Sequence, residues 1–400
     1  MFKEAPVRAS FFSELQRRAP DPLLSIIGQC RADKRAHKID VGVGVFRNDA
    51  GETPVLQAIK AAECELLETQ HTKAYLGPEG DLEFIGHMAD LAMGQAAERR
   101  RLVGVQTPGG TGALRQAAAL VRVSKPDARV FVGTPSWPIH EPIFHHAGLA
   151  VQKYRYFNRS TQTVAFDEMM DALGGARRGD LVLLHGACHN PTGADLTLAQ
   201  WCEVAKLLDR TGAVPLVDLA YQGLGDGLEQ DAAGLRLILD ACETTLVAYS
   251  CDKNFGLYRE RTGAFFAHTQ ADPDIVRSNA LEISRTAWSM PPDHGAAAVN
   301  IILRSPALTK LWKSELAAMQ ARLSGLRALL ADQHPCLASL RNHRGMFALL
   351  DLTAEDARAL ARDHAIYLAE SGRINIAGLR EDTVGRFARA IATLRESDPS

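Results

Sequence analysis

Residues 245–261 read TLVAYSCDKNFGLYRER: an apolar run ends at Ser250, and Lys253 follows three positions later. The run is apolar on both faces, which is typical of a strand buried inside a parallel sheet. A lysine directly after such a strand is expected to be desolvated, which lowers its pKa and makes its amine available for Schiff-base chemistry. Most lysines lie exposed in surface loops, so this interpretation depends on the rest of the sequence.

Three further runs are short and β-rich: Val130–Gly133, Leu181–His185 and Ala213–Asp218. Between them lie helical patterns such as Thr197–Thr211, where apolar residues recur at helical spacing. Alternation of this kind predicts an α/β domain with a mostly parallel sheet and helices on both faces.

The pattern changes to long helices from about Pro291 onward, over Ala296–Leu303 and Leu311–Leu330. The strand-like Ile39–Phe46 is separated from the central sheet by a helix, and we expect it to belong with the C-terminal part. These features predict a second, smaller α/β domain. The predicted division is an N-terminal arm with part of the small domain in residues 1–48, a large domain in 49–310 and a small C-terminal domain in 311–400.

Composition excludes several classes of protein. The 45 Lys and Arg residues against 47 Asp and Glu lack the basic excess of a nucleic-acid-binding protein. The seven cysteines are odd in number and never spaced as C-x-x-C, which argues against a disulfide framework or a structural zinc site. The sequence has no signal-peptide core and no apolar stretch of the roughly 20 residues that span a bilayer. We therefore expect a soluble cytoplasmic protein with reduced thiols.

Polar residues follow the ends of several strand-like runs, where open α/β sheets bind their ligands. They are Asn190, Asp218, Ser250 and Lys253. Any one of them is more often a turn former than a functional residue. Four at one edge of a sheet nevertheless predict a site there.

A glycine cluster, TPGGTGALR at 107–115, precedes a helical run from Ala113 to Val121. Glycines let backbone N–H groups approach an anion, and the positive end of the helix dipole adds to the attraction. The alternative is a tight turn with Thr111 as the helix cap. The stretch lacks a P-loop lysine and the G-x-G-x-x-G spacing, so a monophosphate is the favoured ligand, and Arg261 is a candidate partner for it.

Besides the glycine cluster and the segment around Lys253, four more motifs match a known family: PSWPIH (135–140), HGACHNPTG (185–193), DLAYQG (218–223) and SGRINIAG (371–378). From Ile39 to Gly378 the sequence resembles class I, the aspartate/aromatic branch, of the fold-type-I aminotransferases. The resemblance implies a homodimer that uses pyridoxal 5'-phosphate, with the cofactor bound in the large domain. It implies no metal.

The resemblance assigns roles around the cofactor ring. Lys253 would bind the cofactor covalently and then move the proton of the substrate, as a general acid and base. Asp218 would pair with the ring nitrogen, with His140 behind it. Tyr221 and Asn190 would hydrogen-bond the phenolic oxygen, and Trp137 would stack on the ring and contact the substrate.

The resemblance also assigns residues that would bind the cofactor phosphate and the carboxylates of the substrate. The residues implied for the cofactor phosphate are Gly110, Thr111, Ser250, Arg261 and, from the neighbouring subunit, Tyr75. The residues implied for substrate are Arg373 for the α-carboxylate, helped by Asn190 and the backbone of Gly44, then Phe347, and Arg285 donated across the dimer to a dicarboxylate side chain. Arg285 predicts that 2-oxoglutarate and glutamate form one half of the substrate pair.

Asp252 departs from this pattern, because close relatives usually carry serine beside the catalytic lysine. A carboxylate repels a phosphate dianion. We expect either that Asp252 points away from the phosphate, or that a cation such as Arg259 compensates it. A side chain that faces the phosphate unpaired would contradict the interpretation.

Three positions near the substrate are larger or less polar than in relatives specialised for aspartate: Ala74, Trp288 and Met290. An apolar lining accepts an aromatic ring, so the sequence favours transamination between an aromatic L-amino acid and 2-oxoglutarate. Thr53 and Thr111 match the aspartate-specific pattern instead. A strict aspartate aminotransferase is therefore the alternative.

Other classes of protein fit less well. A metallohydrolase would need H-E-x-x-H, but His145 lies one position too late after His140, and Pro142 would disturb the helix. A serine hydrolase would need G-x-S-x-G, which does not occur. A regulator with this fold would need a DNA-binding module, and the stretch before Ile39 is too short for one. A lyase or decarboxylase that uses the same cofactor is the nearest competitor.

Overall fold

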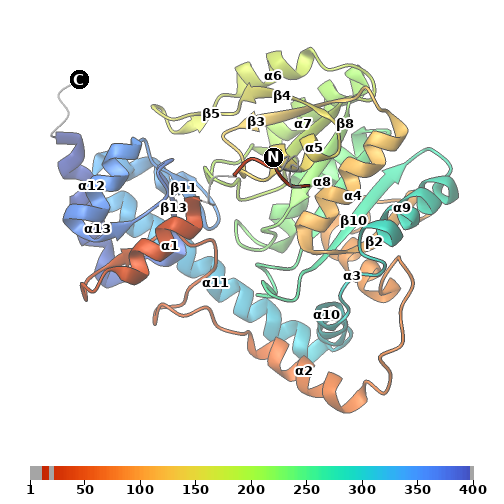
Figure 1. Cartoon of the computed structure of the whole chain (residues 1–400), viewed down its shortest axis with the longest axis horizontal. Helices are drawn as coiled ribbons and strands as arrows, with labels where there is room; N and C mark the ends of the chain where they lie inside the picture. Colours follow the sequence, from red (N-terminus) through yellow and green to blue (C-terminus); the bar gives the residue numbers. More distant parts are fainter. Residues whose placement is uncertain (1–10, 18–21, 397–400) are drawn as a thin grey trace, which may run out of the picture.

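The computed structural model describes residues 11–17 and 22–396. Residues 1–10 and 18–21 of the predicted N-terminal arm, and 397–400 at the end of the predicted small domain, lie outside the described residues. The described chain forms a larger lobe around a central sheet and a smaller lobe that contains both the N-terminal and the C-terminal helices (Figure 1). Helix α11 (Pro306–Gln333) runs from one lobe to the other.

The larger lobe is built on a seven-stranded sheet in the order β2-β10-β9-β8-β7-β3-β4. Every strand runs in the same direction except β10, which is antiparallel to both of its neighbours. The predicted α/β fold with a mostly parallel sheet is therefore confirmed. The strands are β2 (Leu102–Pro108), β3 (Arg129–Thr134), β4 (Ala150–Arg155), β7 (Leu181–His185), β8 (Val214–Leu219), β9 (Thr244–Ser250) and β10 (Thr262–Thr269).

Both faces of the sheet are buried, because successive side chains of a strand point to opposite faces. In β9, Leu246 and Ala248 join one apolar cluster, while Val247 and Tyr249 join the other. The first cluster is shared with α4 (Gly109–Ser124), α5 (His140–His146) and α9 (Pro273–Ala287). The second is shared with α2 (Gln57–Thr69), α3 (Leu82–Met93), α6 (Phe166–Gly174), α7 (Leu198–Thr211), α8 (Leu228–Ala241) and α10 (His294–Arg304).

Two predicted helices begin in different ways. Helix α7 starts after Thr197, whose side chain accepts from the backbone N–H of Gln200 in a reciprocal capping box. Helix α4 starts at Gly109, four residues earlier than its apolar pattern predicts. Thr111 lies inside the first turn of α4, so its interpretation as the helix cap is wrong.

The smaller lobe joins segments from both ends of the chain. Strand β1 (Ile39–Asp40) pairs in parallel with β12 (Ile366–Tyr367), which confirms that the early strand belongs with the C-terminal part. The strand is shorter than Ile39–Phe46, because the side chain of Asn375 donates to the carbonyls of Val43 and Val45. The other elements of this lobe are α1 (Pro22–Ala32), β11 (Phe347–Leu349), α12 (Ala354–His364), β13 (Arg373–Asn375) and α13 (Glu381–Glu396).

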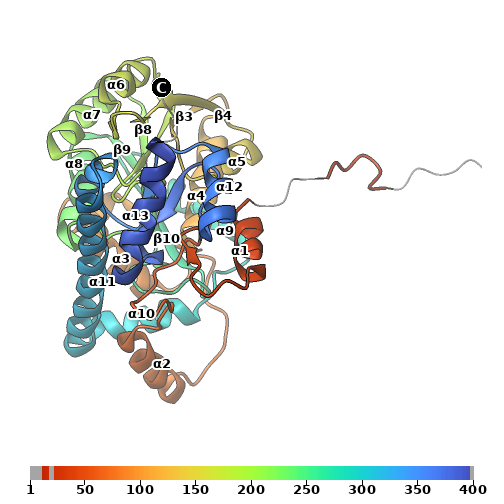
Figure 2. The same ribbon diagram turned by 90° about the vertical axis from the view of Figure 1, so that its left-hand side faces the viewer.

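The described part of the N-terminal segment, residues 11–17, stands away from both lobes (Figure 2). Phe11, Phe12 and Leu15 are exposed there. Across residues 11–17 and 22–396, no helix combines the length and the apolar character needed to cross a membrane.

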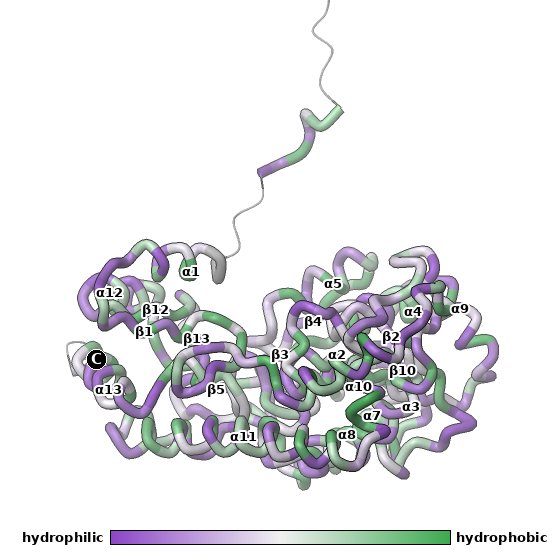
Figure 3. Tube along the Cα trace, turned by 90° about the horizontal axis from the view of Figure 1, so that it is seen from below, coloured by the Kyte–Doolittle hydropathy of each residue, from purple (hydrophilic) through white to green (hydrophobic). Residues whose placement is uncertain are grey.

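Helix α11 is attached to the larger lobe beside the predicted catalytic lysine, and Figure 3 shows that it extends along both lobes. Trp312, near its start, is 0% exposed and stacks on Phe255 with ring centroids 4.4 Å apart. Its indole N–H donates to the carbonyl of Asn254 at 2.8 Å. The segment that follows Lys253 is thereby fixed to the helix that supports the smaller lobe.

Replacing Trp312 should destabilise the protein in two separable steps. Trp312→Phe keeps the ring stack but leaves a buried carbonyl unpaired, which costs about 1–3 kcal/mol. Trp312→Ala also opens a cavity and costs about 3–5 kcal/mol. Urea unfolding followed by circular dichroism measures both changes. Leu198→Ala, at an exposed position of α7, is the control, and equal losses for both tryptophan variants would contradict the role of the hydrogen bond.

Candidate active site

A pocket of about 220 Å³ opens at the carboxyl ends of the parallel strands. It lies where the sequence predicts a site, and Asn190, Asp218, Ser250 and Lys253 all line it. Its walls come from both lobes, since Gly44, Phe347 and Arg373 belong to the smaller one. The lining residues are Gly44, Gly110, Thr111, Leu114, Trp137, His185, Asn190, Asp218, Ala220, Tyr221, Ser250, Asp252, Lys253, Arg261, Phe347 and Arg373.

Three of the predicted site residues do not line this pocket. His140 lies directly behind Asp218. Tyr75 is 92% exposed, and Arg285 is exposed on the last turn of α9, where it donates to the hydroxyl of Ser289 at 2.6 Å. Tyr75 and Arg285 were predicted to act in the pocket of a neighbouring subunit, and that role stays a prediction.

The carboxylate of Asp218 is held at the floor of the pocket by a chain of hydrogen bonds. Its Oδ2 lies 2.9 Å from Nε2 of His140, which is fully buried. The hydroxyl of Ser136 lies 2.8 Å from Nδ1 of His140 and 3.2 Å from Nε2 of His185. His185 is the register partner of Asp218 on the next strand, so the sheet itself brings these groups together.

The surroundings keep Asp218 ionised. Burial alone would raise the pKa of Asp218, but the hydrogen bond from His140 and the nearby positive charge outweigh it, so the pKa lies below its ordinary value. Burial also lowers the pKa of His185 to about 3, which keeps that ring neutral. An ionised carboxylate on the floor of a pocket favours a ligand that presents a protonated nitrogen to it.

Lys253 lies above this floor, with Nζ 5.2 Å from the ring centre of Tyr221. The hydroxyl of Tyr221 accepts from the side-chain N–H of Asn190 at 3.1 Å. Burial, followed by the charge of Asp218, raises the pKa of Tyr221, so its hydroxyl stays protonated and can donate. The side-chain oxygen of Asn190, Oδ1, is buried with no hydrogen-bond partner among the described residues. Tyr221 therefore offers a donor to a ligand oxygen next to the amine, and the side-chain oxygen of Asn190 offers an acceptor to a ligand N–H or O–H.

Arg373 faces the same space from the smaller lobe. It is buried, its guanidinium lies 4.7 Å from the ring centre of Phe347, and it donates to the carbonyl of Gly42 at 3.1 Å. A planar guanidinium of this kind suits a carboxylate, which it can bind through two parallel hydrogen bonds.

The opposite end of the pocket is shaped for an anion. It is formed by the first turn of α4, by Ser250 at the end of β9 and by Arg261. A Cβ atom at Gly110 would lie 3.0 Å from Cβ of Ser250, and one at Gly109 would lie 2.5 Å from Nη2 of Arg261. A side chain at Gly109 would be strained at φ = +68° and would displace the guanidinium of Arg261, and one at Gly110 would crowd Ser250.

Asp252 lines the pocket at this end, so the first of the two expected alternatives, that it points away, is wrong, and the second, compensation by a cation, holds. It is compensated by a cation, but by Arg261 rather than Arg259. Its Oδ2 lies 2.8 Å from Nη1 of Arg261 and 3.7 Å from Nζ of Lys253. Arg261 lines the pocket, and its backbone lies in the left-handed region with φ = +55°.

The residues of the pocket fit pyridoxal 5'-phosphate. The floor offers an anion for the ring nitrogen, the wall offers an aromatic face at Trp137, and the glycine end offers N–H groups and a guanidinium for the phosphate. The unpartnered oxygen of Asn190 and the amine of Lys253 lie between these two ends.

Comparisons with known proteins agree with this geometry. The family described as "Aminotransferase class I and II" matches residues 36–391. This chain belongs to that family. The "Tyrosine aminotransferase" of Rhizobium meliloti strain 1021 is 50% identical over 390 residues, which cover 96% of this chain and all of the relative. The "Aspartate aminotransferase" of Escherichia coli strain K12 is 39% identical over 394 residues, which again cover 96% of this chain and all of the relative.

A solved structure shares the fold and carries the cofactor. It is the aromatic-amino-acid aminotransferase of Burkholderia pseudomallei covalently bound to pyridoxal phosphate. The two structures superimpose with a TM-score of 0.92 at 36% identity, covering 96% of this chain and 99% of the other. The chain is thus a fold-type-I, pyridoxal-phosphate-dependent aminotransferase.

Sequence reasoning missed His185, Leu114 and Ala220 among the lining residues. His185 was detectable, because it ends a predicted strand and opens the motif HGACHNPTG. Leu114 and Ala220 carry no polar signal and are placed only by the geometry of α4 and of the segment after β8.

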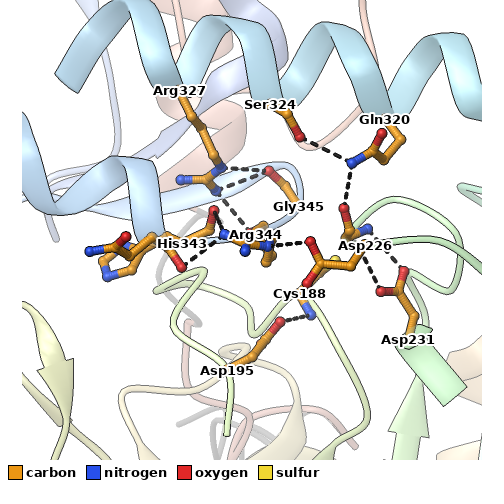
Figure 4. Close-up of polar contacts among 12 residues, drawn as sticks. Cys188, Asp195, Asp226, Asp231, Gln320, Ser324, Arg327, His343, Arg344 and Gly345 are labelled. Atoms are coloured by element: carbon orange, nitrogen blue, oxygen red, sulfur yellow. Dashed lines mark hydrogen bonds and ion pairs between the residues drawn. The ribbon is translucent and has the colours of Figure 1, made fainter. Parts of the chain in front are cut away.

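Polar contacts link the segment that follows β7, with Cys188 and Asp195, to its surroundings, and Figure 4 shows them beside those of Arg327 and Arg344. Asp195 accepts from the backbone N–H groups of Cys188 and His189, at 2.8 Å each. Burial raises the pKa of Asp195 to about 6, so at pH 8 the carboxylate is ionised and can accept both bonds. The backbone N–H of Arg344, in the smaller lobe, donates to the carbonyl of Gly193 in the same loop.

Arg327 forms a second group of polar contacts. It is 2% exposed on α11 and donates to the carbonyls of Arg344, Gly345 and Phe347. No carboxylate forms an ion pair with it within the described parts of the chain. The guanidinium therefore binds only backbone carbonyls among these contacts, and it connects α11 to β11, the strand that contains Phe347.

Asp195→Asn should loosen the Asn190 loop, because an amide can accept only one of the two backbone bonds and presents an N–H₂ group to the other. We expect a loss of about 1–3 kcal/mol in stability at pH 8 and a lower kcat/KM. Urea unfolding and steady-state kinetics measure the two effects. Asp226→Asn, which removes only the half-exposed ion pair with Arg344, is the control. An Asp195→Asn protein as stable and active as this control would refute the role of Asp195.

Proposed function

We propose that this enzyme transfers the amino group of an aromatic L-amino acid to 2-oxoglutarate, giving the keto acid and L-glutamate. The observation that carries the proposal is the assembly of Lys253, Asp218 and Arg373 in one pocket whose remaining wall includes the rings of Trp137 and Phe347. The name of the 50% identical relative, a tyrosine aminotransferase, supports an aromatic substrate. A strict aspartate aminotransferase is the second candidate, favoured by Thr111 in the pocket.

Bound pyridoxal phosphate supplies an aldehyde that captures the substrate amine and a ring that withdraws electrons from the bond to be broken. In our proposal Lys253 holds the cofactor and then carries the proton between two carbon atoms. Asp218 keeps a proton on the ring nitrogen, and His140 orients Asp218. Tyr221 and Asn190 bind the phenolic oxygen, and Arg373 fixes the substrate carboxylate with help from Asn190 and Gly44.

We also propose a homodimer with shared sites, in a reducing compartment such as the cytoplasm. Tyr75 and Arg285 are exposed on this chain, which suits residues that act in a partner's pocket. All seven cysteines are free. We propose that residues 49–310 form the cofactor-binding domain, and that 1–48 and 311–400 supply the arm and the smaller domain.

Substrate preference is tested by comparing kcat/KM for phenylalanine, tyrosine and aspartate with 2-oxoglutarate as the acceptor. We expect the two aromatic substrates to be used at least as well as aspartate, because Trp137 and Phe347 give the pocket aromatic surface. A strong preference for aspartate would favour the second candidate. Keto acid and glutamate must appear in equal amounts, since keto acid without glutamate would indicate lyase chemistry.

Asp218→Asn should reduce kcat by about 10²-fold or more while leaving the cofactor bound, because a neutral amide cannot hold a proton on the ring nitrogen. Single-turnover absorbance measures the chemical step, and absorbance of the washed protein reports the retained cofactor. Asp382→Asn, on the exposed surface of α13, is the matched control. A nearly normal kcat in the Asp218 variant would refute the proposal that Asp218 keeps a proton on the ring nitrogen.

A further inference from the structure

We propose that Asp252 competes with the cofactor phosphate for Arg261, so that this enzyme holds its cofactor less tightly and exchanges it more readily than it would without that carboxylate. The inference rests on the proposed phosphate site at Gly110, Thr111, Ser250 and Arg261. It concerns what Asp252 does to that site.

Asp252 occupies the cation of the phosphate site directly. Its side chain is 10% exposed, lines the pocket and lies 2.8 Å from Nη1 of Arg261. Its other oxygen, Oδ1, is buried without a hydrogen-bond partner among the described residues. The carboxylate thus has an incomplete set of hydrogen bonds at the point where a phosphate is expected to bind.

The charges around Asp252 leave little to offset a second anion. The cations that face it are Arg261 and Lys253. Two titratable neighbours, Cys251 and Tyr258, remain neutral because burial raises the pKa of each, that of Tyr258 to about 12. Once Lys253 is bonded to the cofactor, Arg261 is the cation left to balance both the carboxylate and the phosphate.

Arg261 does not need Asp252 for its position. Its Nη1 also donates to the carbonyl of Tyr258 at 3.0 Å, and its Nη2 lies beside Gly109 at the start of α4. Removing the carboxylate should therefore leave the guanidinium in place and free its charge for the phosphate. The repulsion between two anions a few ångströms apart in a partly buried site is large enough to change phosphate affinity by about tenfold or more.

The test uses Asp252→Asn, which keeps the shape and removes the charge, and Asp252→Ser, which removes both. Dissociation constants are measured by fluorescence on the apoenzyme for pyridoxamine phosphate, for inorganic phosphate and for pyridoxamine, which has no phosphate. We expect both variants to bind the first two ligands about tenfold or more tightly, and pyridoxamine unchanged. Release of pyridoxamine phosphate from the loaded enzyme should slow by a similar factor.

Asp382→Ser is the control, because it removes one carboxylate from an Asp–Arg pair on the surface. Unchanged affinities in both Asp252 variants would overturn the inference, and so would an equal change for pyridoxamine, which would mean a general effect on the fold. Arg261→Ala separates this failure from failure of the proposed site. If this variant binds pyridoxamine phosphate as tightly as the unchanged enzyme, the phosphate site itself is wrongly assigned.

Discussion

The buried contact between Asp218 and His140 is the interaction on which the site depends. A carboxylate removed from water is tolerated only where hydrogen bonds and opposite charge compensate for the lost hydration. His140 supplies one bond at 2.9 Å, and Ser136 and His185 hold that imidazole in place. The carboxylate also lines the pocket, so it can accept a further hydrogen bond from a ligand there. In the proposed function, a protonated ring nitrogen of the cofactor would be the remaining partner of Asp218.

The sheet and α11 bring distant segments to that floor. Parallel strands deliver Asp218 and Ser250 to one edge, whereas Phe347 and Arg373 arrive on the antiparallel pair β11 and β13 of the smaller lobe. Arg327 donates to the carbonyls of Arg344, Gly345 and Phe347, so α11 is bonded directly to the segment that carries Phe347. The contacts that join α11 to the smaller lobe therefore also support one wall of the pocket.

Local rules of sequence predicted the central sheet well, because strands buried on both faces appear as continuous apolar runs, and β7 begins and ends where its run does. They overestimated the length of β1, because beyond Asp40 the side chain of Asn375, not a neighbouring strand, donates to the carbonyls of Val43 and Val45. The partner of Asp252 was also beyond their reach. Sequence distance favours neither Arg259 nor Arg261, and only the folded structure shows that Arg261 pairs with Asp252. The roles predicted for Tyr75 and Arg285 would depend on a second chain.

Charge balance explains why the glycine-rich end of the pocket matters. The lining contains the cations Lys253, Arg261 and Arg373 and the anions Asp218 and Asp252, a formal excess of one positive charge. At the glycine-rich end the charges of Asp252 and Arg261 cancel, so a phosphate near −2 would find no excess of positive side-chain charge there. The start of α4 must therefore contribute, since its free N–H groups carry a partial positive charge that cannot be neutralised by proton loss. Glycines at that turn are as much a part of the electrostatics as the charged side chains.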